Sequence, residues 1–297
     1  NMKFADAFAS EVESVTLHAF DQDGVLRYVK TESGEALKQD GYCMTLDGLN
    51  AGTYNLVAWG GTHDNASYVM PELTTGRSVM TDATCRLAVK QDADGMTYID
   101  TDMRPELFHG MSSEPVTLPD RPGVHTVMLP LVKDINHVHV MLQHLSGEPV
   151  GKEHFKFTIT DDNVSMLHDN SVLTGTEVTY KPWYVHDGVA GLEPAETGRA
   201  VTSVGVALAD LTVGRLMLGH KTRLTVTTSE GDVVLSIPLI DYALLIKEHY
   251  REMSDQEYLD RQDSYALTFF LDERDKWMDS YIYINSWRVV LDDLDFE

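Results

Sequence analysis

The stretch Leu46-Asp-Gly-Leu-Asn-Ala-Gly-Thr-Tyr-Asn-Leu-Val-Ala-Trp-Gly-Gly61 predicts a turn that delivers the chain into a strand. Its glycines suit the turn, because glycine adopts the positive φ angles of tight corners at little cost. Side chains alternate between the two faces of an extended chain, so Tyr54 and Leu56 share one face and Trp59 lies on the other. The stretch therefore predicts a strand that is entered through a glycine corner.

The same alternation of apolar and polar residues recurs in short runs along the chain. Strands are expected at residues 15–20, 25–29, 42–46, 86–89, 96–99, 135–142, 155–160, 224–228, 233–237 and 281–291. Asp23-Gly24 and Asp94-Gly95 separate two such runs each, and an Asp-Gly pair in that position is a strong hairpin signal. Short strands with turns between them favour β-sandwiches.

One helical region interrupts the strands. Residues 243–253 have a helical pattern, and Ser254 with Glu257 forms a capping-box signature that opens a second, short helix. The expected fold class is therefore all-β with a minor α component, and the helical insertion lies near residues 243–262.

The length and the prolines predict two domains. The chain has 297 residues, and a domain typically has about 100–200. Five of the ten prolines lie between Pro105 and Pro130. Proline has no backbone N–H to donate to a neighbouring strand, so this stretch does not favour a central strand of a sheet. We expect an N-terminal β-sandwich domain at residues 1–128 and a C-terminal one at residues 129–297.

The charge excludes one class of partner. The chain has 47 acidic and 23 basic residues, and its net charge is −24. A nucleic-acid partner needs a basic face, so we expect none. No stretch approaches the about 18 consecutive apolar residues of a membrane span. The acidic surface suits an exported protein.

The two cysteines leave two alternatives open. Cys43 and Cys85 form no Cys-x-x-Cys pair, so a zinc site or a thioredoxin-type motif has no support. A disulfide in an oxidising compartment and two unpaired buried thiols both fit the sequence.

No enzyme is expected, because the sequence has no Gly-x-Ser-x-Gly, His-Glu-x-x-His or phosphate-binding loop motif. We expect no catalytic, cofactor-binding or metal-binding residues. His137 and His139 share one strand face and could chelate a metal, but surface histidines explain the spacing better. The adjacent pairs Asp161-Asp162 and Asp292-Asp293 would point apart in strands.

Two further motifs have ordinary structural explanations. Asp21-x-Asp23-Gly and Asp92-x-Asp94-Gly resemble the start of a calcium loop, but lack its later ligands and fit turns. Trp183 could stack on a sugar together with Tyr180 and Tyr184, or could pack a proline-containing loop.

Four stretches in order resemble one family. They are Val15-Thr-Leu-His-Ala-Phe-Asp-Gln-Asp-Gly24, Gly52-Thr-Tyr-Asn-Leu-Val-Ala-Trp-Gly-Gly61, Leu107-Phe-His-Gly110 and Tyr283-Ile-Asn-Ser-Trp-Arg-Val-Val290. Together the chain resembles the FimB-like fimbrillin-anchoring proteins of Bacteroidales type V fimbriae, over nearly its full length.

The resemblance implies two tandem transthyretin-like β-sandwich domains and no cofactor. It also implies a lipoprotein of the outer membrane at the base of a fimbria, with fimbrial subunits as partners that join by strand addition. The lipidated N-terminal cysteine of that family does not lie in this sequence, which begins at Asn1. The alternatives are a stalk or tip fimbrillin that acts as an adhesin, and a surface carbohydrate-binding module that uses Trp183 and Tyr184. The strand expected at residues 281–291 is a candidate for strand exchange, and the alternative is a permanently docked final strand whose Trp287 belongs to the core.

Overall fold

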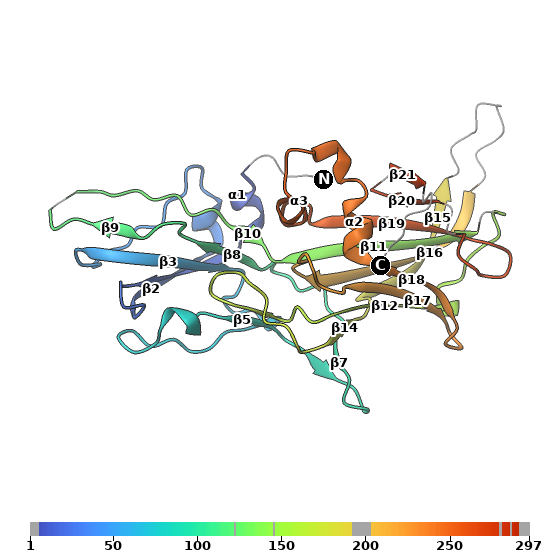
Figure 1. The fold of residues 1–297 in the computed structure, drawn as a ribbon, viewed down its shortest axis with the longest axis horizontal. Coiled ribbons are helices and arrows are strands. Elements are labelled where there is room, and N and C mark those ends of the chain that lie inside the picture. The colour runs from blue at the N-terminus through green and yellow to red at the C-terminus, as the bar shows by residue number, and fades with distance from the viewer. Residues whose placement is uncertain are drawn as a thin grey trace.

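The computed structural model describes residues 6–121, 123–144, 146–191, 203–278, 281–285 and 287–290. The molecule is elongated, with the N-terminal half at one end and the C-terminal half at the other (Figure 1). The described residues form three six-stranded sheets and one three-stranded sheet, and their helices are short. The predicted all-β class with a minor α component is confirmed.

The first sheet lies in the N-terminal half and has the strand order β10-β8-β3-β1-β2, with β9 also paired to β3. Its strands are β1 (Ser14–Phe20), β2 (Leu26–Ser33), β3 (Gly52–Gly60), β8 (Phe108–Met111), β9 (Val116–Leu118) and β10 (Val132–Lys133). All of these pairs are antiparallel. Gly48 has a φ of 88°, as the predicted corner before β3 requires.

Strand β3 separates two hydrophobic cores, as its alternation predicts. Tyr54 and Leu56 belong to the core on one face, while Trp59 lies fully buried in the core on the other. The indole N–H of Trp59 donates to Ala83 O at 3.2 Å. Gly61 ends this stretch with a φ of 77°, and a Cβ there would lie 1.9 Å from Glu106 O. Only glycine fits that position.

Two further sheets form a sandwich in the C-terminal half. One has the order β15-β16-β11-β19-β20-β21, and the other has the order β18-β17-β12-β14-β7-β6. The strands of the first are β11 (Ile135–His144), β15 (Tyr184–Gly191), β16 (Ser203–Gly214), β19 (Ser264–Leu271), β20 (Tyr281–Ile284) and β21 (Trp287–Val290). Those of the second are β6 (Lys90–Gln91), β7 (Thr97–Ile99), β12 (Phe155–Asp161), β14 (Val178–Tyr180), β17 (Arg223–Thr228) and β18 (Val233–Pro238).

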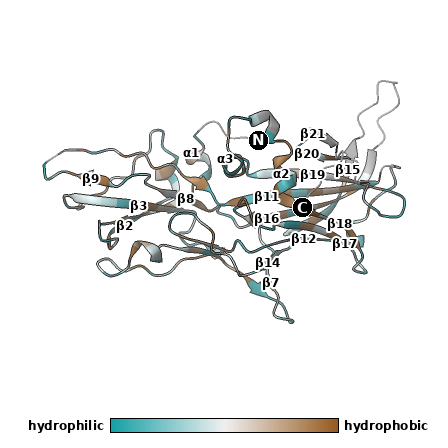
Figure 2. Cartoon of the chain, viewed as in Figure 1, coloured by the Kyte–Doolittle hydropathy of each residue, from teal (hydrophilic) through white to brown (hydrophobic). Residues whose placement is uncertain are grey.

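The sandwich core lies between these two sheets. Val138 and Val140 of β11 are buried in the same cluster as Phe157 and Ile159 of β12. In Figure 2 the strands of this half are largely hydrophobic, whereas the hairpin at β7 is hydrophilic. The alternation in β11 and β12 therefore places one face of each strand in a shared core.

Strands of the N-terminal half also pair with strands of the C-terminal half. Strand β7 pairs in parallel with β14, so that Tyr98 lies opposite Thr179. The three-stranded sheet joins β13 (Ser165–Met166) to β5 (Cys85–Leu87) and β4 (Tyr68–Val69). These pairings cross the expected boundary at residues 128 and 129, and the division into two domains stays a prediction.

The helical elements surround the sheets. They are α1 (Phe8–Glu11), α2 (Leu239–Leu244) and α3 (Asp255–Arg261), and the 3-10 helices η1 (Gly34–Lys38), η2 (Met80–Asp82), η3 (Lys152–His154) and η4 (Lys247–Tyr250). Ser254 caps α3, because its side chain accepts the Glu257 N–H at 3.1 Å, as predicted. The expected helix at residues 243–253 is wrong in detail, since α2 begins earlier and a 3-10 turn follows it.

No helix in the described part of the chain is long and apolar enough to cross a bilayer.

Three predicted strands differ from the structure. The strand expected at residues 86–89 ends at Leu87, and the strand that pairs with β7 across the Asp94-Gly95 turn is β6. Residues 42–46 form no strand, although Tyr42, Met44 and Leu46 pack half-buried against the core that contains Leu56. The alternation there reflects packing on a sheet face without backbone pairing. The single strand expected at residues 281–291 is a hairpin of β20 and β21, because Asn285 takes a φ of 49° and the chain reverses.

Candidate functional site: a polar junction and the exposed edges

The chain passes between the two halves at Lys133, whose ammonium group meets three carboxylates. Its Nζ atom lies 3.2 Å from Glu11 and 2.6 Å from Asp263, and it also pairs with Glu106. The Lys133 side chain is only 8% exposed. Burial alone would lower the pKa of Lys133, but hydrogen bonds to Asp263 and Glu106 outweigh it and raise the pKa above its usual range. The junction is thus fixed by a charged cluster.

Glu106 extends this cluster to His137. His137 Nε2 lies 2.8 Å from the Glu106 carboxylate, and His137 Nδ1 lies 3.2 Å from the Thr212 hydroxyl. Burial would raise the pKa of Glu106, but hydrogen bonds from His137 and Lys133 lower it to about 2. His139 instead pairs with Asp210 at 2.6 Å. Each histidine of the candidate pair therefore has its own carboxylate.

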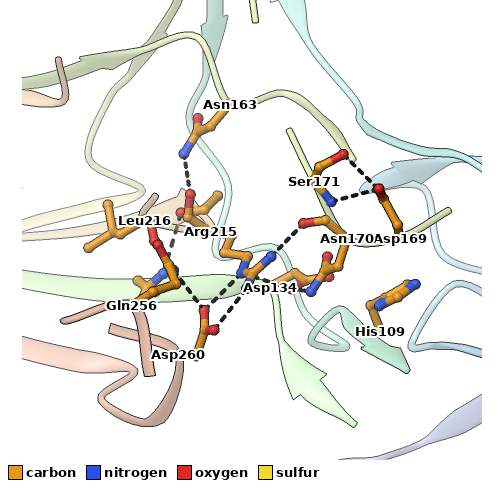
Figure 3. A network of polar contacts seen from close by, with 12 residues as sticks. His109, Asp134, Asn163, Asp169, Asn170, Ser171, Arg215, Leu216, Gln256 and Asp260 are labelled. Atoms are coloured by element: carbon orange, nitrogen blue, oxygen red, sulfur yellow. Dashed lines mark hydrogen bonds and ion pairs between the residues drawn. The ribbon is translucent and has the colours of Figure 1, made fainter. Parts of the chain in front are cut away.

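A second polar network lies beside the first and centres on Arg215 (Figure 3). The guanidinium of Arg215 binds the Asp260 carboxylate through Nε and Nη2, each at 2.8 Å. Its Nη1 donates to Asn170 O, and Asn170 Nδ2 donates to Asp134 Oδ1 at 2.9 Å. Such two-point contacts fix orientation as well as distance.

Asp134 is the most buried member of the second network. Its side chain is fully buried, and its Oδ1 lies 3.9 Å from Arg215 Nε. Burial raises the pKa of Asp134 to about 7, although Arg215 and Asn170 both lower it. Asp134 Oδ2 accepts no hydrogen bond from any described residue. Asp134 directly follows Lys133, so both networks hold the same short segment.

The two networks draw on elements that are remote in sequence. Lys133 and Asp134 have partners in α1, in the segment before β8, in the β13–β14 loop, at the end of β16 and in the segment between α3 and β19. Arg215 and Asp260 are separated by 45 residues, and no local pattern marks them as partners. Nothing in the sequence therefore predicts this junction. Chemically the arrangement joins the two halves of the molecule through buried ion pairs and hydrogen bonds.

Residues 123–131 form an extended segment on the surface of the N-terminal half. Within the described residues, their backbone groups make no hydrogen bond. Val124 and Met128 are 94% and 89% exposed. At its end the segment lies against β8, because a Cβ on Gly110 would be 2.6 Å from Pro130 O. This segment is an unpaired, β-prone strip beside a sheet edge.

An aromatic strip lies at the start of the edge strand β15. The Trp183 and Tyr184 rings are stacked at 6.1 Å, and the Tyr184 and His186 rings are stacked at 4.6 Å. Trp183 is 40% exposed and Tyr184 is 51% exposed. Tyr180, the third aromatic residue singled out in the sequence, is fully buried and donates to Asn163 Oδ1 at 2.6 Å.

The aspartate turns and the two cysteines have ordinary structural roles. Asp21 and Asp92 accept backbone N–H groups of their own turns, at Val25 and Met96, both at 2.9 Å, as the turn explanation predicts. Cys43 and Cys85 are free thiols, as in the second alternative, but Cys43 is exposed and only Cys85 is buried. Burial raises the pKa of the Cys85 thiol.

The adjacent pair Asp161-Asp162 differs from its expectation. The side chains do not point apart, because β12 ends at Asp161 and both carboxylates reach His220. The pair Asp292-Asp293 lies outside the described residues.

Comparison with known proteins gives a family match over nearly the whole chain. The family model of the fimbrillin-A associated anchor proteins Mfa1 and Mfa2 matches residues 1–293. A search of curated proteins finds no match to the chain.

Several solved structures are similar to this chain. A crystal structure of a candidate adhesin from Bacteroides thetaiotaomicron has 33% identity and a TM-score of 0.82, and the match covers 98% of this chain and 94% of that one. Candidate polysaccharide binding proteins from the same organism have 32% identity and a TM-score of 0.79, with the same coverage. The fimbrial anchor protein Mfa2 from Porphyromonas gingivalis has 19% identity and a TM-score of 0.64, with 95% and 92% covered, and shares the fold.

Proposed function

The chain belongs to the family of fimbrillin-A associated anchor proteins, and we propose that it attaches a fimbria to the outer membrane and receives the adjoining fimbrial subunit by strand addition. It is a structural subunit of fimbriae at the cell surface, as the sequence resemblance predicted. The family match over residues 1–293 carries this proposal.

The polar junction supports the anchoring role. An anchor must pass tension from the fimbria to the membrane without separating its own halves. Lys133 with its three carboxylates and Arg215 with Asp260 hold the connecting segment through buried, charge-assisted hydrogen bonds. Strand pairs between β7 and β14 and between β5 and β13 add a second connection between the halves.

Residues 123–131 are our candidate site for strand addition. A strand is added through unpaired backbone N–H and C=O groups, and side-chain pockets provide selectivity. This segment has an unpaired backbone within the described residues and exposes Val124 and Met128. The opposite sheet edge, β2, carries Arg27, Lys30 and Glu32, and charged residues oppose edge pairing.

A proline substitution tests this site. Thr126→Pro removes one exposed backbone donor, and Thr126→Ala is the matched control that keeps it. We expect cells with Thr126→Pro to release fimbriae into the medium, whereas Thr126→Ala cells retain them, with both proteins equally stable. Retention of fimbriae by Thr126→Pro cells rules out strand addition at this segment and leaves the anchoring role standing.

Two experiments test the anchoring role itself. Labelled fatty acid should be incorporated at an N-terminal cysteine of the cellular precursor, and immunogold labelling should find the protein only at the base of fimbriae. Labelling along the shaft or at the tip would instead identify a stalk or tip fimbrillin.

The aromatic strip of β15 favours a second candidate function, binding of a surface carbohydrate. Sugars stack on exposed aromatic faces, and Trp183 and Tyr184 present two stacked rings. A similar solved structure is named for polysaccharide binding. Glycan-array binding by the wild-type protein that disappears in Trp183→Ala would support this function. An empty array would count against it.

We also propose that the protein has no enzymatic activity, in keeping with a family of structural anchor proteins. A broad hydrolase screen should show only background rates. Activity abolished by a single substitution of an Asp, Glu or His would refute this proposal.

A further inference from the structure

We propose that Asp161, Asp162 and His220 bind a divalent first-row transition metal ion of the zinc type. Asp161 is the last residue of β12, and Asp162 follows it directly. His220 lies between β16 and β17, in the loop that leads into the neighbour of β12. Pairing of β12 with β17 brings this loop to the end of β12, where Thr160 lies opposite Arg223.

The three donor atoms have the spacing of ligands on one face of an ion. His220 Nδ1 lies 3.2 Å from Asp161 Oδ1 and 3.0 Å from Asp162 Oδ1. All three ligand atoms lie within 4.8 Å of one another. An ion bound at about 2.0–2.2 Å from each ligand holds neighbouring donor atoms about 3.0–3.5 Å apart. Little rearrangement is therefore needed for an ion to bind.

The protein orients both carboxylates toward this point. Thr222 Oγ1 donates to Asp161 Oδ2 at 2.5 Å, and the Gly175 N–H donates to Asp162 Oδ2 at 3.1 Å. In each carboxylate one oxygen is thus held by a protein donor and the other faces His220. Asp161 Oδ1, which faces His220, also accepts the Asp162 N–H at 2.8 Å. Outer hydrogen bonds of this kind orient the ligands of protein metal sites.

The three side chains differ in their exposure to solvent. The Asp161 side chain is 1% exposed, His220 is 11% exposed and Asp162 is 34% exposed. An ion can enter from the Asp162 side, where water can complete its coordination. One imidazole with two carboxylates suits zinc and its neighbours, whereas Ca²⁺ takes oxygen ligands only.

A bound ion would stiffen a segment that links the two halves. Gly175 belongs to the loop between β12 and β14, which also carries β13 and Asn170. Strand β13 pairs with β5 of the N-terminal half, and Asn170 donates to Asp134 at the junction. The ion would link Asp161 and Asp162, at the start of this loop, to His220 of the β16–β17 loop. Gly175, near the other end, is held through its hydrogen bond to Asp162.

Calorimetric titration tests the site on the full chain after treatment with a chelator. Zn²⁺ should bind in a 1:1 complex and raise the thermal midpoint. Asp162→Asn and His220→Ala should each weaken binding by about tenfold or more. His139→Ala is the matched control, because it removes a histidine that also pairs with a carboxylate, and binding should be unchanged.

A spectroscopic measurement separates a metal site from a simple ion pair. Co²⁺ bound to the wild-type protein should give d–d absorption bands that His220→Ala abolishes and His139→Ala keeps. Absence of Zn²⁺ binding in the wild-type protein, or binding equally strong in Asp162→Asn and His220→Ala, would overturn the proposal. In that case His220 forms only an ion pair with the two aspartates.

Discussion

At the scale of single residues, the two faces of β3 have different partners. Leu56 is 7% exposed and packs in the core that contains Tyr54, whereas Trp59 packs in the other core. Leu56→Ala should lower the free energy of unfolding by about 2–5 kcal/mol, because it removes buried methyl groups and leaves a cavity. Chemical denaturation measures this. Val69→Ala, at a residue that is 54% exposed, should change stability by less than about 0.5 kcal/mol.

Asp134 should make stability depend on pH. Its pKa in the folded protein is raised to about 7 by burial, so the folded state holds a proton that the unfolded state has lost above about pH 4. The wild-type protein therefore loses stability as the pH rises from about 4 to about 7 through this group. Asp134→Asn does not titrate, so its stability relative to wild type should rise over that range, by at most about 4 kcal/mol.

Urea denaturation at several pH values measures this difference between Asp134→Asn and the wild type. Asp94→Asn, at an exposed turn position, is the control for the same chemical change. A difference between Asp134→Asn and the wild type that does not change with pH would mean that Arg215 keeps the Asp134 carboxylate ionised in the folded protein.

At the scale of elements, the C-terminal hairpin combines a buried strand and an edge strand. Ile282 and Ile284 of β20 are fully buried, while among the described residues β21 pairs only with β20. A protein that ends at Ser280 should lose cooperative thermal unfolding, because it loses core residues. A protein that ends at Asn285 should still unfold cooperatively, and its ability to join fimbrial subunits then tests β21 as an exchanged strand.

Calorimetry and a subunit pull-down distinguish these truncations. Cooperative unfolding by the protein that ends at Ser280 would show that β20 contributes little to the core. Full assembly by the protein that ends at Asn285 would remove β21 from the candidates for exchange.

At the scale of the whole molecule, residues 123–131 should be the first site of proteolysis. This exposed segment has no backbone hydrogen bonds within the described residues. Thermolysin cleaves before apolar residues and should cut near Val127 or Met128. The fragments should stay together in size-exclusion chromatography, because β7 pairs with β14 and Lys133 binds Glu11 and Glu106 across the cut.

This digestion also tests the division into domains at residues 128 and 129. First cleavage elsewhere would move the boundary. Separation of the fragments under native conditions would mean that the polar junction and the crossed strand pairs contribute little to holding the halves together.

Interactions between residues close in the sequence explain the features that the sequence by itself determined. Alternation in residues 54–59 fixed both faces of β3, Asp21 and Asp92 fixed two turns, and Ser254 fixed the start of α3. Each of these depends on neighbours within a few residues, so a single stretch contains all the information. The ordered motifs likewise identified the family, because they span the chain.

Only the tertiary structure decided which distant residues meet. Lys133 with Asp263, Arg215 with Asp260, and Asp161 with His220 are pairs from separate elements. Their contacts depend on the strand order and on the pairing of β7 with β14 and of β13 with β5 between the two halves. No local periodicity in the sequence predicts these pairings. Charged residues also look alike in a sequence whether they are solvated or buried, because burial is a property of the packed chain.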